Sequence, residues 1–461
     1  MFALISPAAL CERRDYFIDR AFDERTETPA PLGRDYKNEI GTRRYPWDLS
    51  FKDWFESPYA MPMRRYVLEE RGIVPTVSYL GNFAANPSGG RARSADIASN
   101  VDMSLDADFG KLSGARELEG LSLGNVWSWR FGDGITPDAI CNNFNVQQVD
   151  GDPAMRCQAL YLSYKNDVRG DWLVLLKAGR FAAGDNFMVS PIYWLYQNNA
   201  FDGNPVGVFK QQRWSAYPGS TWAAFARVDR KGGQYFKAGA YKINTAAQDS
   251  PGRHGLDWSF SGDGVNANFE LGQNFNHDDS GKSPASVSAG VAAGWYNAQY
   301  LASPSVAADF SCTVYLQADC MLINLGNPKI DGARRHFIER RGNGAYRDLR
   351  GLVAWGAAQF NPNFDTAQMP LFLSGGLLFN APFKSRADDV ICFGAAYGMF
   401  SGELPASDYR RDSFEIALEL NYKFQVNRFF FLQPNIQYIV NTNGGEYPNA
   451  AVLGLQFGLN L

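Results

Sequence analysis

Residues 414–426 read FEIALELNYKFQV, and apolar side chains occupy every second position of this stretch. A period of two places the apolar side chains on one face of a β-strand and Glu415, Glu419 and Lys423 on the other. Residues 430–440 and 450–461 repeat the alternation, so the end of the chain predicts three consecutive antiparallel strands. In a soluble sandwich the apolar faces would meet a second sheet. Full charges on the opposite face of long strands are instead typical of a transmembrane β-barrel, with lipid outside and a wet lumen inside.

The composition favours one large all-β unit. The 461 residues include 45 Gly, 33 Phe, 22 Tyr and 11 Trp, and mean hydropathy is negative. No run of about 18 apolar residues predicts a transmembrane helix. A barrel is compatible with such statistics, because only every second residue of its strands faces lipid. The net charge of −4 provides no basic surface suited to nucleic acid.

The chain is expected to divide into two parts. Residues 1–60 are polar and rich in Arg, Asp and Pro, and they predict a leader or periplasmic arm that carries the remnant of a truncated signal. Residues 61–461 predict the barrel, preceded by a short helix over 62–72 with Pro near its start and Gly at its end. Six Cys are too few for a disulfide scaffold, and whether Cys141 and Cys157 pair stays open.

Strand candidates recur along the whole barrel region. Twelve precede the closing three, at 74–83, 101–109, 118–130, 158–166, 172–181, 220–229, 234–244, 265–274, 286–298, 346–360, 370–380 and 389–400. A bacterial single-chain barrel has an even number of strands. Residues 313–322, TVYLQADCML, supply the missing strand within the long 299–345 stretch, because fifteen strands would leave the two ends of the barrel on opposite sides of the membrane. The prediction is therefore an antiparallel barrel of sixteen strands.

A set of short motifs covers residues 62–461. It comprises RYVLEERGI at 65–73, LDAD at 105–108, KAGRF at 177–181, QNNAF at 197–201, YLQAD at 315–319, ELNY at 419–422 and LQPNIQYI at 432–439. As a set, these motifs resemble the carbohydrate-selective porin family, the OprB type. The resemblance implies a sixteen-stranded outer-membrane barrel that lets sugars diffuse down a gradient. It also implies a homotrimer that needs no cofactor and performs no chemistry.

A sugar-selective lumen requires charged or amide side chains for the hydroxyl groups and aromatic surfaces for the C–H faces. The predicted substrate-contacting or pore-lining residues are Asp102, Asp106, Asp108, Arg130, Arg180, Arg227, Asp229, Lys237, Asn268, Glu270, Glu415, Glu419 and Lys423. Arg180 is expected to brace the lumen by pairing with a carboxylate. For each residue, the alternative is a solvated wall or an ion pair that braces the barrel. The aspartates of 100–109 and the glutamates of 413–426 are expected to form an acidic wall opposite a basic one.

The segment 182–219 is too long and too aromatic for a plain surface loop. It either folds inward to narrow the pore or packs against the extracellular rim.

Other functions are weakly supported. The three His lie in loop-like stretches without metal-ligand spacing. Glu415 and Glu419 lie about 13 Å apart along a strand, farther than the two carboxylates of a glycosidase, which are roughly 5–9.5 Å apart. A soluble β-sandwich would not explain sixteen strands with charged inner faces. A barrel with another transport role, as a general diffusion pore, receptor or polymer-export channel, is the remaining alternative. The sequence thus predicts an outer-membrane porin in contact with lipid and permeated by sugars, and no enzyme, metal or cofactor.

Overall fold

The computed structural model describes residues 72–460, apart from 169–170, 202, 205–206, 244–253, 278–281, 327–345, 347–348, 387, 406–412 and 427–429. The predicted arm over 1–60 and the predicted helix over 62–72, except Gly72, lie outside the described residues.

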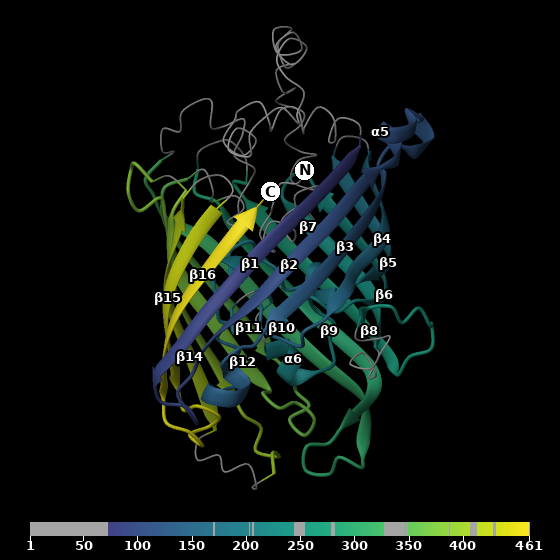
Figure 1. The fold of residues 1–461 in the computed structure, drawn as a ribbon. Helices are drawn as coiled ribbons and strands as arrows, with labels where there is room; N and C mark the ends of the chain where they lie inside the picture. Colours follow the sequence, from purple (N-terminus) through teal and green to yellow (C-terminus); the bar gives the residue numbers. More distant parts are fainter. Residues whose placement is uncertain are drawn as a thin grey trace.

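Sixteen antiparallel strands form a closed barrel (Figure 1). They are β1 (Ile73–Ser88), β2 (Ala95–Asp108), β3 (Leu121–Gly132), β4 (Met155–Val168), β5 (Trp172–Phe181), β6 (Thr221–Arg230), β7 (Gln234–Ile243), β8 (Gly264–Phe275), β9 (Ala285–Gln299), β10 (Ala307–Asn324), β11 (Gly351–Phe360), β12 (Leu371–Asn380), β13 (Val390–Met399), β14 (Phe414–Gln425), β15 (Phe430–Val440) and β16 (Ala450–Asn460). Each strand pairs with its neighbours in sequence, and β1 closes the ring on β16, where Tyr79 lies opposite Leu459. Closure leaves no open sheet edge, as a strand structure in lipid requires.

Short helical turns lie between the strands. They are α5 (Phe109–Ser113), η3 (Arg116–Leu118), η4 (Thr136–Ile140), η5 (Ala183–Asp185), η6 (Tyr193–Leu195) and α6 (Gly207–Gln211). None of the helices in the described part of the chain has the length and apolar character needed to cross a membrane.

Most predicted strands are confirmed within a few residues. The strand required by parity, 313–322, lies inside β10. Several predicted starts are wrong: β2 begins at Ala95 rather than 101, β3 at Leu121 rather than 118, and β11 at Gly351 rather than 346. Residues 116–118 form the helical turn η3 instead, and Arg350 donates its Nε hydrogen bond to the Ala381 carbonyl (3.0 Å) before β11 begins.

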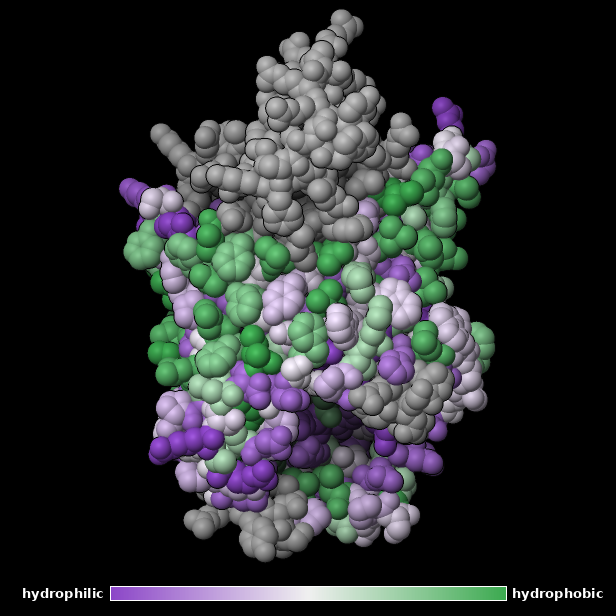
Figure 2. Space-filling model, in the orientation of Figure 1, coloured by the Kyte–Doolittle hydropathy of each residue, from purple (hydrophilic) through white to green (hydrophobic). Residues whose placement is uncertain are grey.

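Exposure alternates along the strands as the sequence predicts. On β14, Glu415 and Glu419 are buried and face the lumen, whereas Leu420 is 49% exposed on the outer side. Figure 2 shows hydrophobic residues in a band over the outer wall, with hydrophilic residues toward the end opposite the start of β1 and the end of β16. An apolar exterior around a polar lumen is the reverse of a soluble protein and fits a lipid environment.

The two ends of the barrel differ in their connections. β1 starts and β16 finishes at the same end, the upper one in Figure 1. Both termini of such barrels lie in the periplasm, so this is the periplasmic end. The connections at the opposite, extracellular end include two long ones, 133–154 after β3 and 182–220 after β5.

Candidate functional site: the lumen and the segment that crosses it

Residues 182–220, which we call the strap, fold into the lumen. At one wall Tyr217 donates a hydrogen bond to Asp102 of β2 (2.7 Å). Farther round the barrel, Tyr193 donates to Gln317 of β10 (3.0 Å), and Glu419 of β14 accepts from the strap backbone. The strap leaves β5 and returns to β6, and β14 lies eight positions from β6 in the ring of sixteen strands, on the opposite side. The strap therefore crosses the lumen, and of the two alternatives for 182–219 it is inward folding that the structure shows.

Aromatic packing holds the strap against β11–β13. Tyr196 and Phe201 of the strap are fully buried and pack against Trp355 of β11, at ring-centroid distances of 5.5 and 6.3 Å. The Trp355 indole also donates to the Tyr196 hydroxyl (2.8 Å). Aromatic side chains bury much apolar area each and favour such tilted contacts. The hydrophobic core thus lies inside the lumen, between the strap and the wall.

Two glutamates of β14 anchor the inward segments. Glu419 accepts hydrogen bonds from the backbone N–H groups of Gln197 (3.0 Å) and Asn198 (2.8 Å) of the strap. Glu415 accepts from the backbone N–H of Asn143 (2.8 Å), in the other long connection, 133–154. Both carboxylates are at most 1% exposed. Backbone N–H groups of the inward segments therefore take the place of water around both carboxylates.

A basic and acidic pair fixes the start of the strap. Lys237 of β7 and Glu270 of β8 form a buried ion pair at 2.9 Å. Lys237 donates to the Asn186 carbonyl (2.9 Å), and Glu270 accepts from the backbone N–H of Met188 (3.2 Å). The pair therefore binds a carbonyl and an N–H of the strap at the same time.

Tyr217 fixes the end of the strap to β2 and β3. Its hydroxyl donates to Asp102 (2.7 Å) and accepts from the Asn100 amide (2.7 Å), while the Arg130 guanidinium lies 5.2 Å from the ring centroid. Burial, and secondly the Asp102 charge, raise the pKa of Tyr217 well above its usual range. The hydroxyl therefore stays protonated and remains a donor to Asp102.

The other predicted residues have separate partners. Arg227 forms an ion pair with Asp229 on the same strand (2.8 Å), and Asn268 accepts a hydrogen bond from the Trp214 indole (3.1 Å). The Lys423 ammonium lies 4.6 Å from the Phe431 ring centroid. Asp106 is half-buried on β2, and Asp108 caps α5 by accepting from the Lys111 N–H (3.0 Å). Asp108 thus lies at the periplasmic end, outside the part of the lumen that the strap crosses.

The prediction that Arg180 braces the lumen is wrong. Arg180 is paired with Leu160 and Trp222, which belong to the outward-facing sets of β4 and β6. Its guanidinium donates to the Ser220 carbonyl (3.2 Å) and the Asp257 carbonyl and lies 5.3 Å from the Trp258 ring centroid. Strict alternation from the lumen-facing Lys177 already places Arg180 on the outer face.

The expected acidic wall opposite a basic wall is wrong in its basic members: Arg180 lies outside, and Lys237 is paired with Glu270. Glu415 and Glu419 face the lumen as expected, and backbone N–H groups bind both carboxylates. Glu415, Glu419, Lys237 and Glu270 instead bind backbone groups of the inward segments, because these segments bring unpaired N–H and carbonyl groups into the barrel.

The strap residues that meet these charges were missed by the sequence reasoning. They are Gln197, Asn198 and Tyr217. One signal was present: β14 carries two acidic residues on its lumen face, and the long connection contains the amide-rich run QNNAF. Cys141 and Cys157, whose pairing was left open, are both free thiols.

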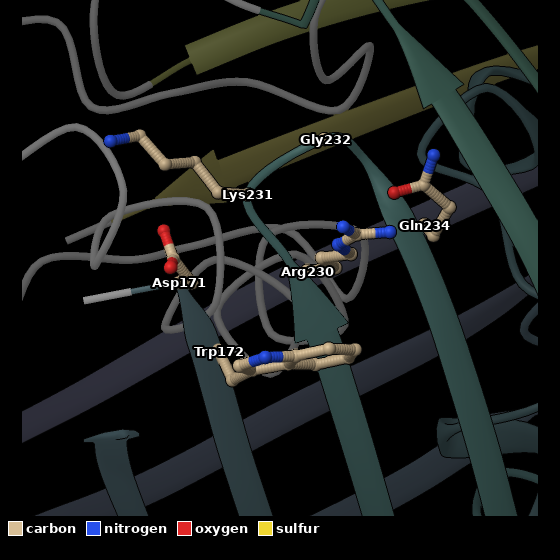
Figure 3. A pocket seen from close by; sticks show the side chains of 6 residues that line it. All are labelled: Asp171, Trp172, Arg230, Lys231, Gly232 and Gln234. Atoms are coloured by element: carbon tan, nitrogen blue, oxygen red, sulfur yellow. The ribbon is translucent and has the colours of Figure 1, made fainter. Parts of the chain in front are cut away.

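A hollow of about 570 Å³ lies at the periplasmic rim (Figure 3). Figure 3 shows the Arg230 guanidinium over the Trp172 ring, 5.7 Å from its centroid, and near Gln234. Trp172 and Arg230 are paired on the outward side of β5 and β6. The hollow therefore lies outside the lumen and off the path of a permeating solute.

A closed sixteen-stranded barrel with an apolar exterior, a polar wall and a strap across its lumen defines the class of outer-membrane porins. The family model of the carbohydrate-selective porins, OprB family, matches residues 92–461, and the chain belongs to this family. It is a bacterial outer-membrane channel that lets carbohydrates diffuse passively, with a preference for sugars.

Solved structures show the same fold. The high-pH structure of OprB from Pseudomonas putida is 21% identical, with a TM-score of 0.73 over 89% of this chain and 97% of that one. The low-pH structure of the same protein is 16% identical, with a TM-score of 0.53 over 89% and 97%. OmpF of Salmonella typhi, in complex with daunomycin, is 9% identical, with a TM-score of 0.51 over 85% and 99%. No curated protein matches the chain.

Proposed function

We propose that sugars permeate through the passage beside the strap, and that the strap sets the preference for them. The observation that carries this proposal is that the strap is bound to nearly opposite walls, by Lys237 of β7 and by Glu419 of β14, which lie seven positions apart in the ring of sixteen strands. A segment held at both walls narrows the lumen permanently. Solutes then pass close to its side chains, and close contact with lining groups is what makes a pore selective.

The charges of the lumen favour neutral solutes. Lys237, Glu270, Arg227 and Asp229 are in buried ion pairs. Glu419 is surrounded by N–H donors. Charges compensated in this way attract free ions less, so hydroxyl, amide and aromatic groups dominate the interaction with a solute. A sugar has many hydroxyl groups and no charge, which matches such a lining.

We assign the contact with solute to half-buried side chains of the strap, above all Trp194 and Asn199. An indole ring suits the C–H face of a sugar, and an amide group suits its hydroxyls. The predicted lumen residues Asp102, Arg130, Asn268, Glu415 and Lys423 then act as positioning residues, which hold the strap or brace the wall. Asp106 remains a candidate for direct contact.

We further propose that the protein acts as a homotrimer without catalytic activity, as the family resemblance implies. Residues 1–60 would form an arm separate from the barrel, and outer-membrane lipid would surround the strands. The exposed apolar outer wall supports the last point.

Liposome swelling tests the proposal. Liposomes that contain the protein are diluted into iso-osmotic solutions of a monosaccharide, a disaccharide, and an amino acid close in size to the monosaccharide. We expect the monosaccharide to enter faster than the amino acid. Rates that follow molecular size alone would leave a general diffusion pore, and no swelling with any solute would favour a receptor or export role.

A pair of tryptophan variants tests the role of the strap in the same assay. Trp194→Ala should lower the ratio of sugar to amino-acid entry, because it removes the aromatic surface beside the passage. Trp172→Ala is the matched control, since Trp172 lies on the outward side at the periplasmic rim. An equal ratio in both variants would show that Trp194 does not contact the sugar.

A further inference from the structure

Residues 254–263, the described part of the connection between β7 and β8, lie across the outer wall of the barrel near its extracellular end. We call this segment the cuff. Its hydrogen bonds reach four neighbouring strands in turn. His254 Nδ1 contacts the Met155 carbonyl of β4 (2.8 Å), and Arg180 of β5 donates to the Asp257 carbonyl. The Trp222 indole of β6 donates to the Trp258 carbonyl (3.1 Å), and Lys242 of β7 donates to the Ser259 carbonyl (2.9 Å).

These partners lie on the lipid-facing side. Phe225 and Arg227 of β6 are buried on the lumen side, so Trp222 faces outward. Trp222 is paired with Arg180, and Lys242 follows the lumen-facing Tyr241 directly in sequence. Two cations on the outer face of a membrane barrel are costly unless they are paired. Here both bind the cuff, and Lys242 also contacts the Asp257 carboxylate (3.3 Å).

The irregular backbone of the cuff fixes the level at which it lies. Peptide groups without regular pairing do not face the hydrocarbon layer, because each unsatisfied group costs several kcal/mol there. Arg180, Trp222 and Lys242 satisfy three carbonyls of the cuff from the barrel side. The cuff therefore lies outside the centre of the hydrocarbon layer, toward the extracellular side.

The cuff leaves large apolar side chains exposed on the outer surface. Phe260 is 79% exposed and Trp258 43% exposed, and Phe260 stacks on Trp222 with a centroid distance of 4.6 Å. The patch continues onto the strands through Met155 (44%) and Trp129 (48%). Aromatic rings at this level are typical anchors at a membrane interface.

We propose that the cuff is a lipid-binding surface that seats the barrel in the outer leaflet, with Trp258 and Phe260 inserted at the boundary of acyl chains and headgroups. Lipid is the occupant because the patch is continuous with the apolar outer wall of the strands. Arg180 and Lys242 hold the cuff flat so that both rings stay at this depth. The cuff adds a membrane-anchoring site to the conducting lumen, and it does not depend on which solute permeates.

Depth-dependent fluorescence quenching tests this inference. The full-length protein is reconstituted into phosphatidylcholine vesicles brominated either near the glycerol backbone or near the acyl-chain ends. The contribution of Trp258 is the difference between the wild type and Trp258→Phe. We expect the shallow bromines to quench it more than the deep ones, and aqueous iodide to quench it little. Trp355→Phe is the control. Trp355 lies in the lumen, out of reach of the brominated chains, so its contribution should not change between shallow and deep bromines.

A second variant separates depth from folding. Arg180→Gln combined with Lys242→Gln should release the cuff, so that lipid quenching of Trp258 falls and iodide quenching rises, while the barrel keeps its heat-modifiable migration. Strong iodide quenching of Trp258 in the wild type would overturn the proposal, because the cuff would then stand in water. Resistance to both quenchers together with cross-linking through Phe260→Cys would also overturn it, in favour of a second copy of the chain as occupant.

Discussion

Glu419 shows how single residues determine what the lumen is like. Its carboxylate receives two backbone N–H groups of the strap and the Asn421 amide (2.7 Å), and it has no basic partner among these contacts. A hydrogen bond to a charged group is worth about 1.5–3 kcal/mol net. Loss of two such bonds is enough to change the population of a docked segment by orders of magnitude, because about 1.4 kcal/mol corresponds to tenfold.

Glu419→Gln should therefore loosen the strap. The amide keeps one acceptor oxygen but turns its NH₂ group toward backbone N–H donors, which leaves at least one N–H without a partner. We expect higher single-channel conductance and more current noise. The measurement is single-channel recording in planar bilayers, with Glu117→Gln on the periplasmic turn as the control, since Glu117 is exposed in η3. Identical conductance in the two variants would show that Glu419 does not hold the strap.

For single residues, the sequence predicts which side of the barrel wall a side chain faces, but not which residue it hydrogen-bonds. Alternation places Glu415, Glu419 and Lys423 correctly in the lumen, and applied strictly it would also have placed Arg180 outside. The partners could not be predicted, because Gln197 and Glu419 are 222 residues apart in sequence. No local period connects a loop to a strand on the far wall.

At the scale of elements, β10 is the clearest case. Its two faces alternate as the predicted strand 313–322 requires: Leu316 is 52% exposed, whereas Tyr315 is buried and bonded to Glu270 (2.7 Å). The strand was predicted because the number of strands must be even. Its true length, Ala307–Asn324, exceeds the prediction, since the ends contain residues without clear alternation.

Cysteine labelling tests the phase of β10. In a variant whose native cysteines are replaced by Ser, Gln317→Cys should react with a small charged maleimide that enters through the pore, because Gln317 is half-buried on the lumen side. Leu316→Cys should be protected by lipid and should react only with an apolar maleimide. Equal labelling of both sites by the charged reagent in intact membranes would contradict the strand phase.

For the whole molecule, the sequence predicts the barrel but not the packing of the segments that fold into its lumen. The sixteen strands, their order and the lipid-facing side follow from alternation, turn spacing and parity. The packing of Tyr196 and Phe201 on Trp355 inside the lumen does not, because Trp355 lies on an inward face that the pattern marks as wet. The contact with the strap explains why an apolar residue such as Trp355 lies on the lumen face.

The central claim is that the strap narrows the lumen and makes it select sugars. The most direct measurement is the single-channel ion current at rising concentrations of a neutral monosaccharide, with the intact chain and with a variant in which residues 190–212 are replaced by a short Gly-Ser linker. The barrel closes through its strands, so the variant should still insert as a heat-modifiable barrel. We predict a saturable sugar block in the intact protein. In the variant, conductance should be higher and the block lost. Equal conductance and an equal block in both proteins would contradict the account.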